Sequence, residues 1–181
     1  MLFVRHATTP GMRAARFPGD EDADAAGLAK AASLRFTTTS LVWAAPGKAA
    51  RQTARAMGLH ARRATALREA DCGRWRGLAY DQVAQEEPQA LMSWLTDPAA
   101  APHGGESLAA HASRVAGWLD SVRDEPEQVA VCDAGTIRAA LGHALGADPL
   151  STARIDLAPL SITGLTVTRS GWRIAYVNRR L

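Results

Sequence analysis

The sequence predicts an α/β fold whose mostly parallel sheet is covered by helices on both faces. Short apolar runs of strand length alternate with longer stretches of helical periodicity, a pattern typical of parallel strands joined by crossover helices. The 181 residues suffice for one such domain with a sizeable core. A hydrophobic content of 47% and a charged content of 22% are ordinary for a globular protein. With no internal repeat and no low-complexity linker, we expect a single domain over residues 1–181.

The first expected strand is Leu2-Phe3-Val4, which is too short for a helix and suits a buried central strand. It would deliver Arg5 and His6 to its carboxyl end, where open α/β sheets bind ligands. Arginine can hold a phosphate with two hydrogen bonds, and histidine can act as a nucleophile or a base.

The next elements follow from turn and capping signals. Residues 9–23 read as a loop, and Asp24 can cap a helix from about Ala25 to Phe36. A strand is expected over Leu41–Ala45, ended by Pro46-Gly47, and then a helix over Lys48–Met57. A short strand is expected over Ala64–Leu67, followed by an irregular, glycine-rich segment.

The middle and the end of the chain continue the alternation. Two short helices are expected over Tyr80–Glu87 and Gln89–Leu95, then a loop to Gly105, and residues 80–105 are interpreted as a small helical cap over the sheet edge. The remaining expected elements are a helix within Glu106–Arg123, a strand over Gln128–Cys132, a helix over Thr136–Leu145 and strands over Ser161–Thr168 and Trp172–Val177.

Composition excludes several classes of function. The net charge of +3 is mild and the basic residues are scattered, so we expect no nucleic-acid partner. The two cysteines, Cys72 and Cys132, have no metal-ligand spacing, so no metal is expected, and a reduced, cytoplasmic setting is the default. No apolar run approaches the length needed to cross a membrane, so no membrane association is expected.

Six segments then occur in the order found in one known family. They are Arg5-His6-Ala7-Thr8-Thr9, Ala25–Ala31, Ala44-Ala45-Pro46 through Arg51-Gln52-Thr53-Ala54, Leu67-Arg68-Glu69 with Gly73, Trp75 and Gly77, Gly104-Gly105-Glu106-Ser107, and Val131-Cys132-Asp133-Ala134-Gly135-Thr136-Ile137-Arg138. Together they resemble the signature segments of the histidine phosphatase superfamily, which contains phosphoglycerate mutases and acid phosphatases. The small cap resembles the compact phosphatase branch.

The resemblance implies a phosphoglycerate mutase-like three-layer α/β/α sandwich and a reaction without a cofactor. His6 would attack a phosphomonoester and become phosphohistidine, Arg5 would clamp the phosphate, and Glu69 would protonate the leaving oxygen. Thr9 and the backbone N–H of Thr136 would help to bind phosphate, since a helix start can face an anion. The implied ligand is a small phosphorylated molecule or inorganic phosphate.

The chain departs from the family pattern at the phosphate clamp. The second clamp arginine aligns with Ala49, and the second histidine aligns with Asp133. The first change removes a bidentate donor, and the second replaces a donor with a carboxylate that repels phosphate. Asp133 is expected to pair with Arg5 or to bond to His6. A metal site formed with His6 and Glu69 is only an alternative that the alignment leaves open.

Other side chains are candidates to replace the missing groups. They are Arg13, Arg16, Arg74, Arg76 and His103. Cys132 is expected to pack rather than react, and His60, His111 and His143 are expected to lie away from the motifs.

Two functions remain open from the sequence. The favoured hypothesis is a pseudophosphatase or very weak phosphatase, kept for binding a ligand or a protein partner. The alternative is an active phosphomonoesterase that works through His6 with Glu69 as the general acid.

Overall fold

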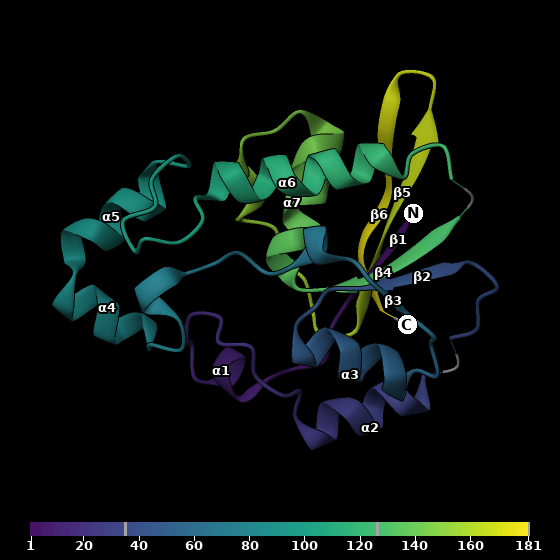
Figure 1. Cartoon of the computed structure of the whole chain (residues 1–181), viewed down its shortest axis with the longest axis horizontal. Helices are drawn as coiled ribbons and strands as arrows, with labels where there is room; N and C mark the ends of the chain where they lie inside the picture. Colours follow the sequence, from purple (N-terminus) through teal and green to yellow (C-terminus); the bar gives the residue numbers. More distant parts are fainter. Residues whose placement is uncertain (35, 126, 181) are drawn as a thin grey trace.

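The structure is a computed structural model that describes residues 1–34, 36–125 and 127–180, so Leu181 of the expected domain lies outside the described residues (Figure 1). Its centre is a six-stranded sheet in the order β3-β2-β4-β1-β5-β6. Strands β1 to β4 pair in parallel, and only β5 among the described strands runs antiparallel to its neighbours, β1 and β6, which confirms the mostly parallel sheet. The strands are β1 (Leu2–Arg5), β2 (Leu41–Ala44), β3 (Arg62–Arg63), β4 (Gln128–Cys132), β5 (Ser161–Thr168) and β6 (Gly171–Arg180).

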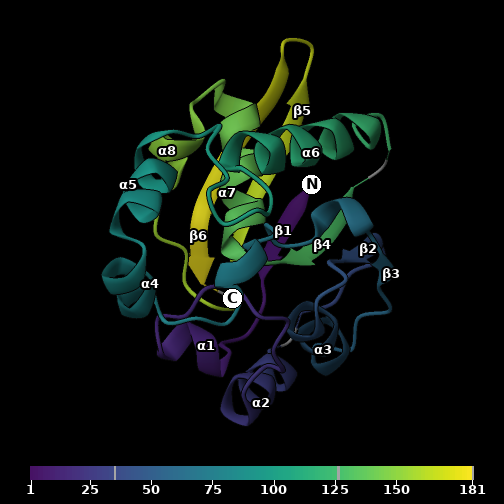
Figure 2. The same ribbon diagram turned by 60° about the vertical axis from the view of Figure 1, so that its left-hand side comes forward.

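Helices cover both faces of this sheet, which confirms the three-layer α/β/α sandwich. In Figures 1 and 2, α2 and α3 lie on one face and α6 and α7 on the other, while α4 and α5 stand beyond the edge of the sheet. The helices are α1 (Pro10–Arg13), α2 (Ala25–Ser33), α3 (Lys48–Ala56), α4 (Tyr80–Glu86), α5 (Pro88–Thr96), α6 (Leu108–Ser121), α7 (Ala134–Leu145) and α8 (Pro149–Thr152). In the ranges that the structure describes, no helix has the length and apolar character to span a membrane.

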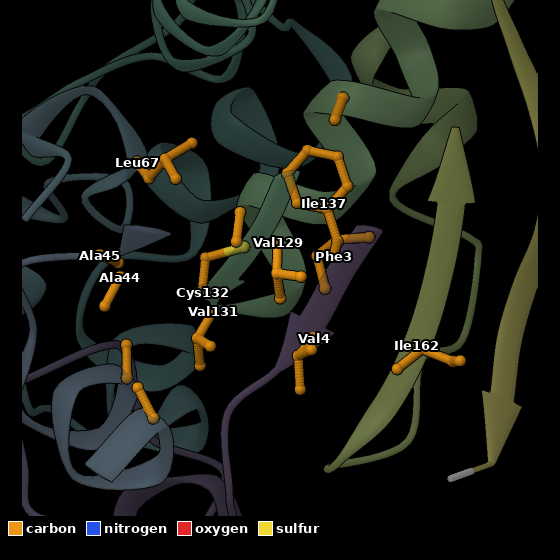
Figure 3. Close-up of a cluster of buried hydrophobic side chains, with 14 of the residues drawn as sticks. Phe3, Val4, Ala44, Ala45, Leu67, Val129, Val131, Cys132, Ile137 and Ile162 are labelled. Carbon is orange, nitrogen blue, oxygen red and sulfur yellow. The ribbon is translucent and has the colours of Figure 1, made fainter. Parts of the chain in front are cut away.

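The main core forms because the central strands are apolar on both faces. Successive side chains of a strand point to opposite faces, so Phe3 lies beside Ile137 of α7 while Val4 points away from it (Figure 3). Phe3 and Val4 are fully buried, and all five residues of β4 are buried. This burial on both faces holds the carboxyl ends of β1 and β4 side by side.

Several expected elements differ from the structure in bounds or type: the loop expected over residues 9–23 contains α1, and the strand expected to end at Val177 continues to Arg180. Thr65–Leu67 is a short 3₁₀ helix rather than part of a strand, and the strand at this place is only Arg62–Arg63. The backbone turns because the N–H groups of Leu67 and Arg68 bond to carbonyls three residues earlier. The first long helix ends at Ser33, since Leu34 is already extended, and Arg35 within the expected helix lies outside the described residues.

A second apolar cluster holds α4 and α5 against the loop after α1. We call it the Trp75 cluster, and its buried members are Phe17, Cys72, Trp75, Val83 and Leu91. The Trp75 ring is fully buried and lies 5.2 Å from the Phe17 ring, centroid to centroid. Its indole N–H donates to Glu87 at 2.9 Å, at the junction between α4 and α5. The cluster therefore joins the segment 80–105 to the edge of the sheet where the site residues lie.

Candidate active site

The candidate site lies where the parallel strands end. Arg5 of β1 pairs with Cys132 of β4, so His6 and Asp133 leave the sheet at the same edge. The N–H of His6 donates to the carbonyl of Cys132 at 2.9 Å. His6, Asp133, Ala49 and Glu69 line one cleft of about 90 Å³, and we call it the inner cleft.

His6 is buried and held as a neutral imidazole. Its Nδ1 lies 2.7 Å from the carbonyl oxygen of Ala7, which can only accept, so Nδ1 carries the hydrogen. Nε2 therefore keeps its lone pair. Burial lowers the pKa of His6, and the Ala7 carbonyl and the Asp133 carboxylate oppose that shift in part. The ring has the protonation state that a nucleophile needs.

The loop that carries His6 is fixed by Thr53 of α3. The Thr53 hydroxyl accepts from the N–H of Ala7 at 2.9 Å and donates to the carbonyl of Ala49 at 2.7 Å. Thr53 is fully buried. Thr53 belongs to one of the matching sequence segments, yet no sequence pattern indicates its role, which only its burial and its two hydrogen bonds reveal.

We expect Thr53→Val to destabilise the protein by about 1–3 kcal/mol, because the buried N–H of Ala7 loses its acceptor while the side-chain volume is kept. Chemical denaturation measures the effect. Thr53→Ser is the matched control, since it keeps the hydroxyl and loses only one methyl group, worth about 0.8 kcal/mol. A valine variant as stable as the wild type would contradict this role.

Arg5 is anchored away from the inner cleft. One guanidinium nitrogen donates to the carbonyl of Leu157, and the other lies 3.9 Å from the sulfur of Met12. Burial and repulsion by Arg138 lower its pKa. Its Nε is buried and, in the described part of the chain, has no hydrogen-bond partner. Arg5 is not one of the residues that line the inner cleft.

Asp133 caps its own helix, and neither the two expected arrangements for it nor the alternative metal site is present. Its Oδ2 accepts from the N–H of Thr136 at 2.9 Å, and its Oδ1 accepts from the Thr136 hydroxyl at 2.6 Å. The backbone N–H of Thr136, which was expected to face a phosphate, is thus bonded to the Asp133 carboxylate. Within residues 1–34, 36–125 and 127–180, Asp133 makes no ion pair with Arg5, and no group of histidine, cysteine and acidic residues is arranged to hold a metal ion.

His111 was expected to lie away from the motifs, and this is wrong. Its ring is buried, with Nε2 3.4 Å from the Thr136 hydroxyl at the start of α7. Burial lowers its pKa, although the Asp133 carboxylate opposes the shift. The reason for the error is tertiary: α6 packs on α7 and brings His111 behind the cap of that helix.

Two more helix starts beside the inner cleft also carry carboxylates. Glu21 accepts from the N–H of Gly11 in α1 at 2.5 Å, and Asp20 accepts from the N–H of Lys48 at the start of α3 at 2.8 Å. Both acids line the inner cleft together with Asp133. No role was expected for these acids, although the acidic run over residues 20–24 is a sequence signal that could have identified them. Backbone N–H groups that could bind an anion are therefore already bonded to carboxylates of the protein.

Glu69 faces the inner cleft from the segment after the 3₁₀ turn. It is open to solvent by surface area, yet protein atoms crowd its carboxyl group enough to raise its pKa. The Asp133 carboxylate raises it further, and together these effects raise the pKa of Glu69 to about 8. A carboxyl group with this pKa is protonated at neutral pH and can act as a general acid.

Thr9 lines the inner cleft, but its hydroxyl caps α1 by accepting from the N–H of Met12 at 3.3 Å.

Of the five candidate replacements for the clamp, only Arg16 lines the inner cleft. Its side chain is exposed and donates to the carbonyl of Gly77 at 3.0 Å. The others are engaged elsewhere: Arg13 with Asp24, Arg74 with Glu87, Arg76 with Asp71, and His103 buried against the Trp75 ring.

Cys132 is fully buried in the main core, which confirms that it packs. Burial raises the pKa of its thiol well above the ordinary value. A protonated thiol is a poor nucleophile.

Comparison with known proteins gives a consistent result. A model described as the histidine phosphatase superfamily (branch 1) matches residues 1–180. Glucosyl-3-phosphoglycerate phosphatase of Mycobacterium tuberculosis is 41% identical over 71 residues, 39% of this chain and 32% of that protein. Phosphoserine phosphatase 1 of Hydrogenobacter thermophilus is 28% identical over 134 residues, 68% of this chain and 64% of that protein. The aligned segments thus span only about a third of the first relative and less than two thirds of the second.

Solved structures agree in fold. A mycobacterial glucosyl-3-phosphoglycerate phosphatase in complex with VO3 superposes with a TM-score of 0.84 at 26% identity, over 99% of this chain and 98% of that one. The same enzyme with inorganic phosphate has a TM-score of 0.81 at 25% identity, over 99% of this chain and 97% of that one. A putative alpha-ribazole-5'-P phosphatase from Escherichia coli, at 18% identity, shares the fold with a TM-score of 0.87, over 99% of this chain and 95% of that one.

Proposed function

Because this chain belongs to the histidine phosphatase superfamily, we propose that it is a pseudophosphatase, a member of that family that binds a small phosphorylated ligand with little or no turnover. One observation carries the proposal. The Asp133 carboxylate stands on the helix start where the family pattern has a second histidine, and it takes the N–H and the hydroxyl of Thr136. Ala49, which aligns with the second clamp arginine, lines the same cleft with a methyl group.

The electrostatic consequence of these two positions is large. A carboxylate about 5 Å from a phosphate repels it by roughly 3 kcal/mol per charge pair at an effective dielectric near 20. Each lost donor to a transferring phosphoryl group costs about 10²–10³ in rate. Phosphoryl transfer depends on position and positive potential. The inner cleft has Asp20, Glu21 and Asp133 on its walls, and the two cations that line it, Arg16 and Lys48, are both exposed. The cleft therefore lacks the fixed, buried positive charge that is the main source of catalysis.

Nearby arginines do not make up the loss. Arg5 is bonded to the Leu157 carbonyl, and the Nε of Arg51 donates to the carbonyl of Pro46 at 3.0 Å. Arg16 is exposed at the rim. The vanadate and phosphate complexes of the mycobacterial relative support a small phosphorylated ligand for this fold.

The alternative, an active phosphomonoesterase, is favoured by two other features. His6 keeps a lone pair on Nε2, and Glu69 keeps the proton that a general acid donates. These are the two reacting groups that the resemblance implies. The nucleophile and the general acid are therefore kept, while the residues of the phosphate clamp are changed.

Hydrolysis of 4-nitrophenyl phosphate from about pH 4 to 9 separates the two functions. We expect the wild type to stay within about threefold of His6→Ala at every pH, since a lost clamp removes a factor of about 10⁴ or more. His143→Ala is the matched control, because that histidine pairs with Asp120 outside the cleft. A wild-type rate about 10² or more above His6→Ala would establish the phosphohistidine enzyme instead.

A further inference from the structure

A second cavity of about 300 Å³ opens directly beside the inner cleft and shares Pro18, Asp20, Gly47 and Glu69 with it. We call it the outer groove. Three arginines line it: Arg63, Arg68 and Arg76. We propose that the outer groove holds the anionic phosphate of the ligand, while a hydroxyl or amine of the same ligand faces the carboxylates of the inner cleft. This inference rests on the proposed function, because it assigns the orientation of the ligand in the same site.

The three guanidinium groups are available to an anion. Within the described residues, Arg63 forms no ion pair and no side-chain hydrogen bond, and it is exposed. Arg68 reaches Glu106 only at 3.3 Å, and that carboxylate is already held by Arg114 at 2.6 Å. Arg76 reaches Asp71 at 3.3 Å, with both side chains about half exposed. Exposed pairs of this kind contribute about 0–1 kcal/mol, so a phosphate can displace them.

Arginine is the side chain best suited to this task. Its planar guanidinium presents paired donors that match a phosphate bidentately, and such charge-assisted bonds are about twice as strong as neutral ones. Three arginines from β3, the segment after the 3₁₀ turn and the glycine-rich segment surround one cavity. The acids of this cavity are Asp20, Glu69 and Asp71, and Glu69 is uncharged at neutral pH because its pKa is about 8.

The inner cleft, in contrast to the outer groove, favours hydrogen-bond donors over anions. The bonds that the structure gives Asp20 and Glu21 use only one oxygen of each carboxylate, Oδ1 of Asp20 and Oε2 of Glu21. The other oxygens are acceptors that an O–H or N–H group satisfies and a phosphate does not. The ligand would therefore enter with its phosphate outward, opposite to the orientation that hydrolysis at His6 requires.

The sizes of the two spaces agree with this orientation. The outer groove, at about 300 Å³, offers more room than the inner cleft, at about 90 Å³, and can accept a phosphate with part of the carbon chain. Glu69 stands where the two spaces meet. Its raised pKa leaves it able to donate a hydrogen bond to the connecting ester oxygen.

Titration with glycerol 1-phosphate and with inorganic phosphate, followed by the shifts of backbone amide resonances, tests the inference. We expect both probes to shift the amides of Arg63, Arg68 and Arg76, and only glycerol 1-phosphate to shift those of His6 and Glu21 as well. Arg63→Gln/Arg76→Gln is expected to raise the Kd of both probes about tenfold or more, because two charge-assisted contacts are lost. Arg173→Gln on β6, at the opposite edge of the sheet from β3, is the matched control and is expected to leave both Kd values unchanged.

Three outcomes would overturn the inference. They are no binding of either probe, phosphate-induced shifts confined to His6 and Thr9, and a Kd that the arginine substitutions leave within twofold of the wild type. Phosphate released from glycerol 1-phosphate on the same samples would refute the pseudophosphatase proposal, while the arginine variants would still decide where the anion binds. A failure of the pseudophosphatase proposal can therefore be distinguished from a failure of the proposed phosphate position.

Discussion

The double variant Ala49→Arg/Asp133→His is expected to hydrolyse 4-nitrophenyl phosphate about 10⁴-fold faster than the wild type, since each restored donor is worth about 10²–10³ in rate. Both positions line the inner cleft, Ala49 in the first turn of α3 and Asp133 before α7. One substitution adds a guanidinium, and the other replaces a repelling carboxylate with a donor. Steady-state kinetics with the aryl phosphate measures the gain.

The single variants and a triple variant serve as controls. Each single substitution should give less than the double one, and adding His6→Ala to the double variant should abolish the gain, because the nucleophile is lost. Asp133→His also removes the N-cap of α7, at a cost of about 1 kcal/mol, so thermal unfolding is compared in parallel. A folded double variant with no gain would show that more of the pocket than these two positions has changed.

The restored activity should depend on pH through Glu69. A general acid must be protonated, so the rate falls as the pH rises through its pKa. The Asp133 carboxylate is one of the causes that raise the pKa of Glu69 to about 8. Its removal in the double variant should therefore move the alkaline limb below pH 8. Glu69→Gln in the same background should remove the limb together with most of the rate.

The second large effect is on stability. Trp75→Ala is expected to lower the free energy of unfolding by about 3–5 kcal/mol, the usual range for a buried large-to-small aromatic substitution. Trp75 is fully buried, packs edge-on against the Trp94 ring at 6.2 Å, and donates to Glu87. Its loss leaves a cavity and removes the contacts that hold α4 and α5. Urea denaturation followed by circular dichroism measures the loss.

Trp172→Ala is the matched control for this substitution. The Trp172 side chain is only partly buried on β6, and its indole N–H donates to the exposed Asp120 at 3.2 Å. The control should lose clearly less stability, since less apolar surface returns to water. Limited proteolysis should cut the Trp75→Ala variant first within residues 80–105. A loss below about 1 kcal/mol, or cleavage elsewhere, would contradict the role given to the Trp75 cluster.

Much of the fold was predictable because local patterns and packing agree. The apolar run at Leu2–Val4 and the strand at Gln128–Cys132 were expected as strands, and both are buried in the sheet. The 3₁₀ turn at Thr65–Leu67 was missed, because a short apolar run cannot distinguish a strand from a turn by periodicity. The choice between a strand and a turn depends on whether a neighbouring strand is available for backbone hydrogen bonds at the edge of the sheet.

The sequence by itself determined which chemical groups this protein has at the family's positions. His6 and Glu69 are present, and Ala49 and Asp133 stand where the resemblance implies an arginine and a histidine. These are facts of identity and order, which no folding can change.

Only the tertiary structure decided what those groups contact. It placed Asp20 on the N–H of Lys48 at the start of α3 and Glu21 on the N–H of Gly11 in α1, and it brought Arg63, Arg68 and Arg76 to one groove. The reason is physical: a carboxylate bonds to whichever unpaired helix donors the packed chain brings within about 3 Å. Asp133 caps its own helix three residues away, whereas the donors to Asp20 and Glu21 come from other parts of the chain. Charge along a sequence therefore indicates that an anion can be bound, whereas packing decides where it is bound.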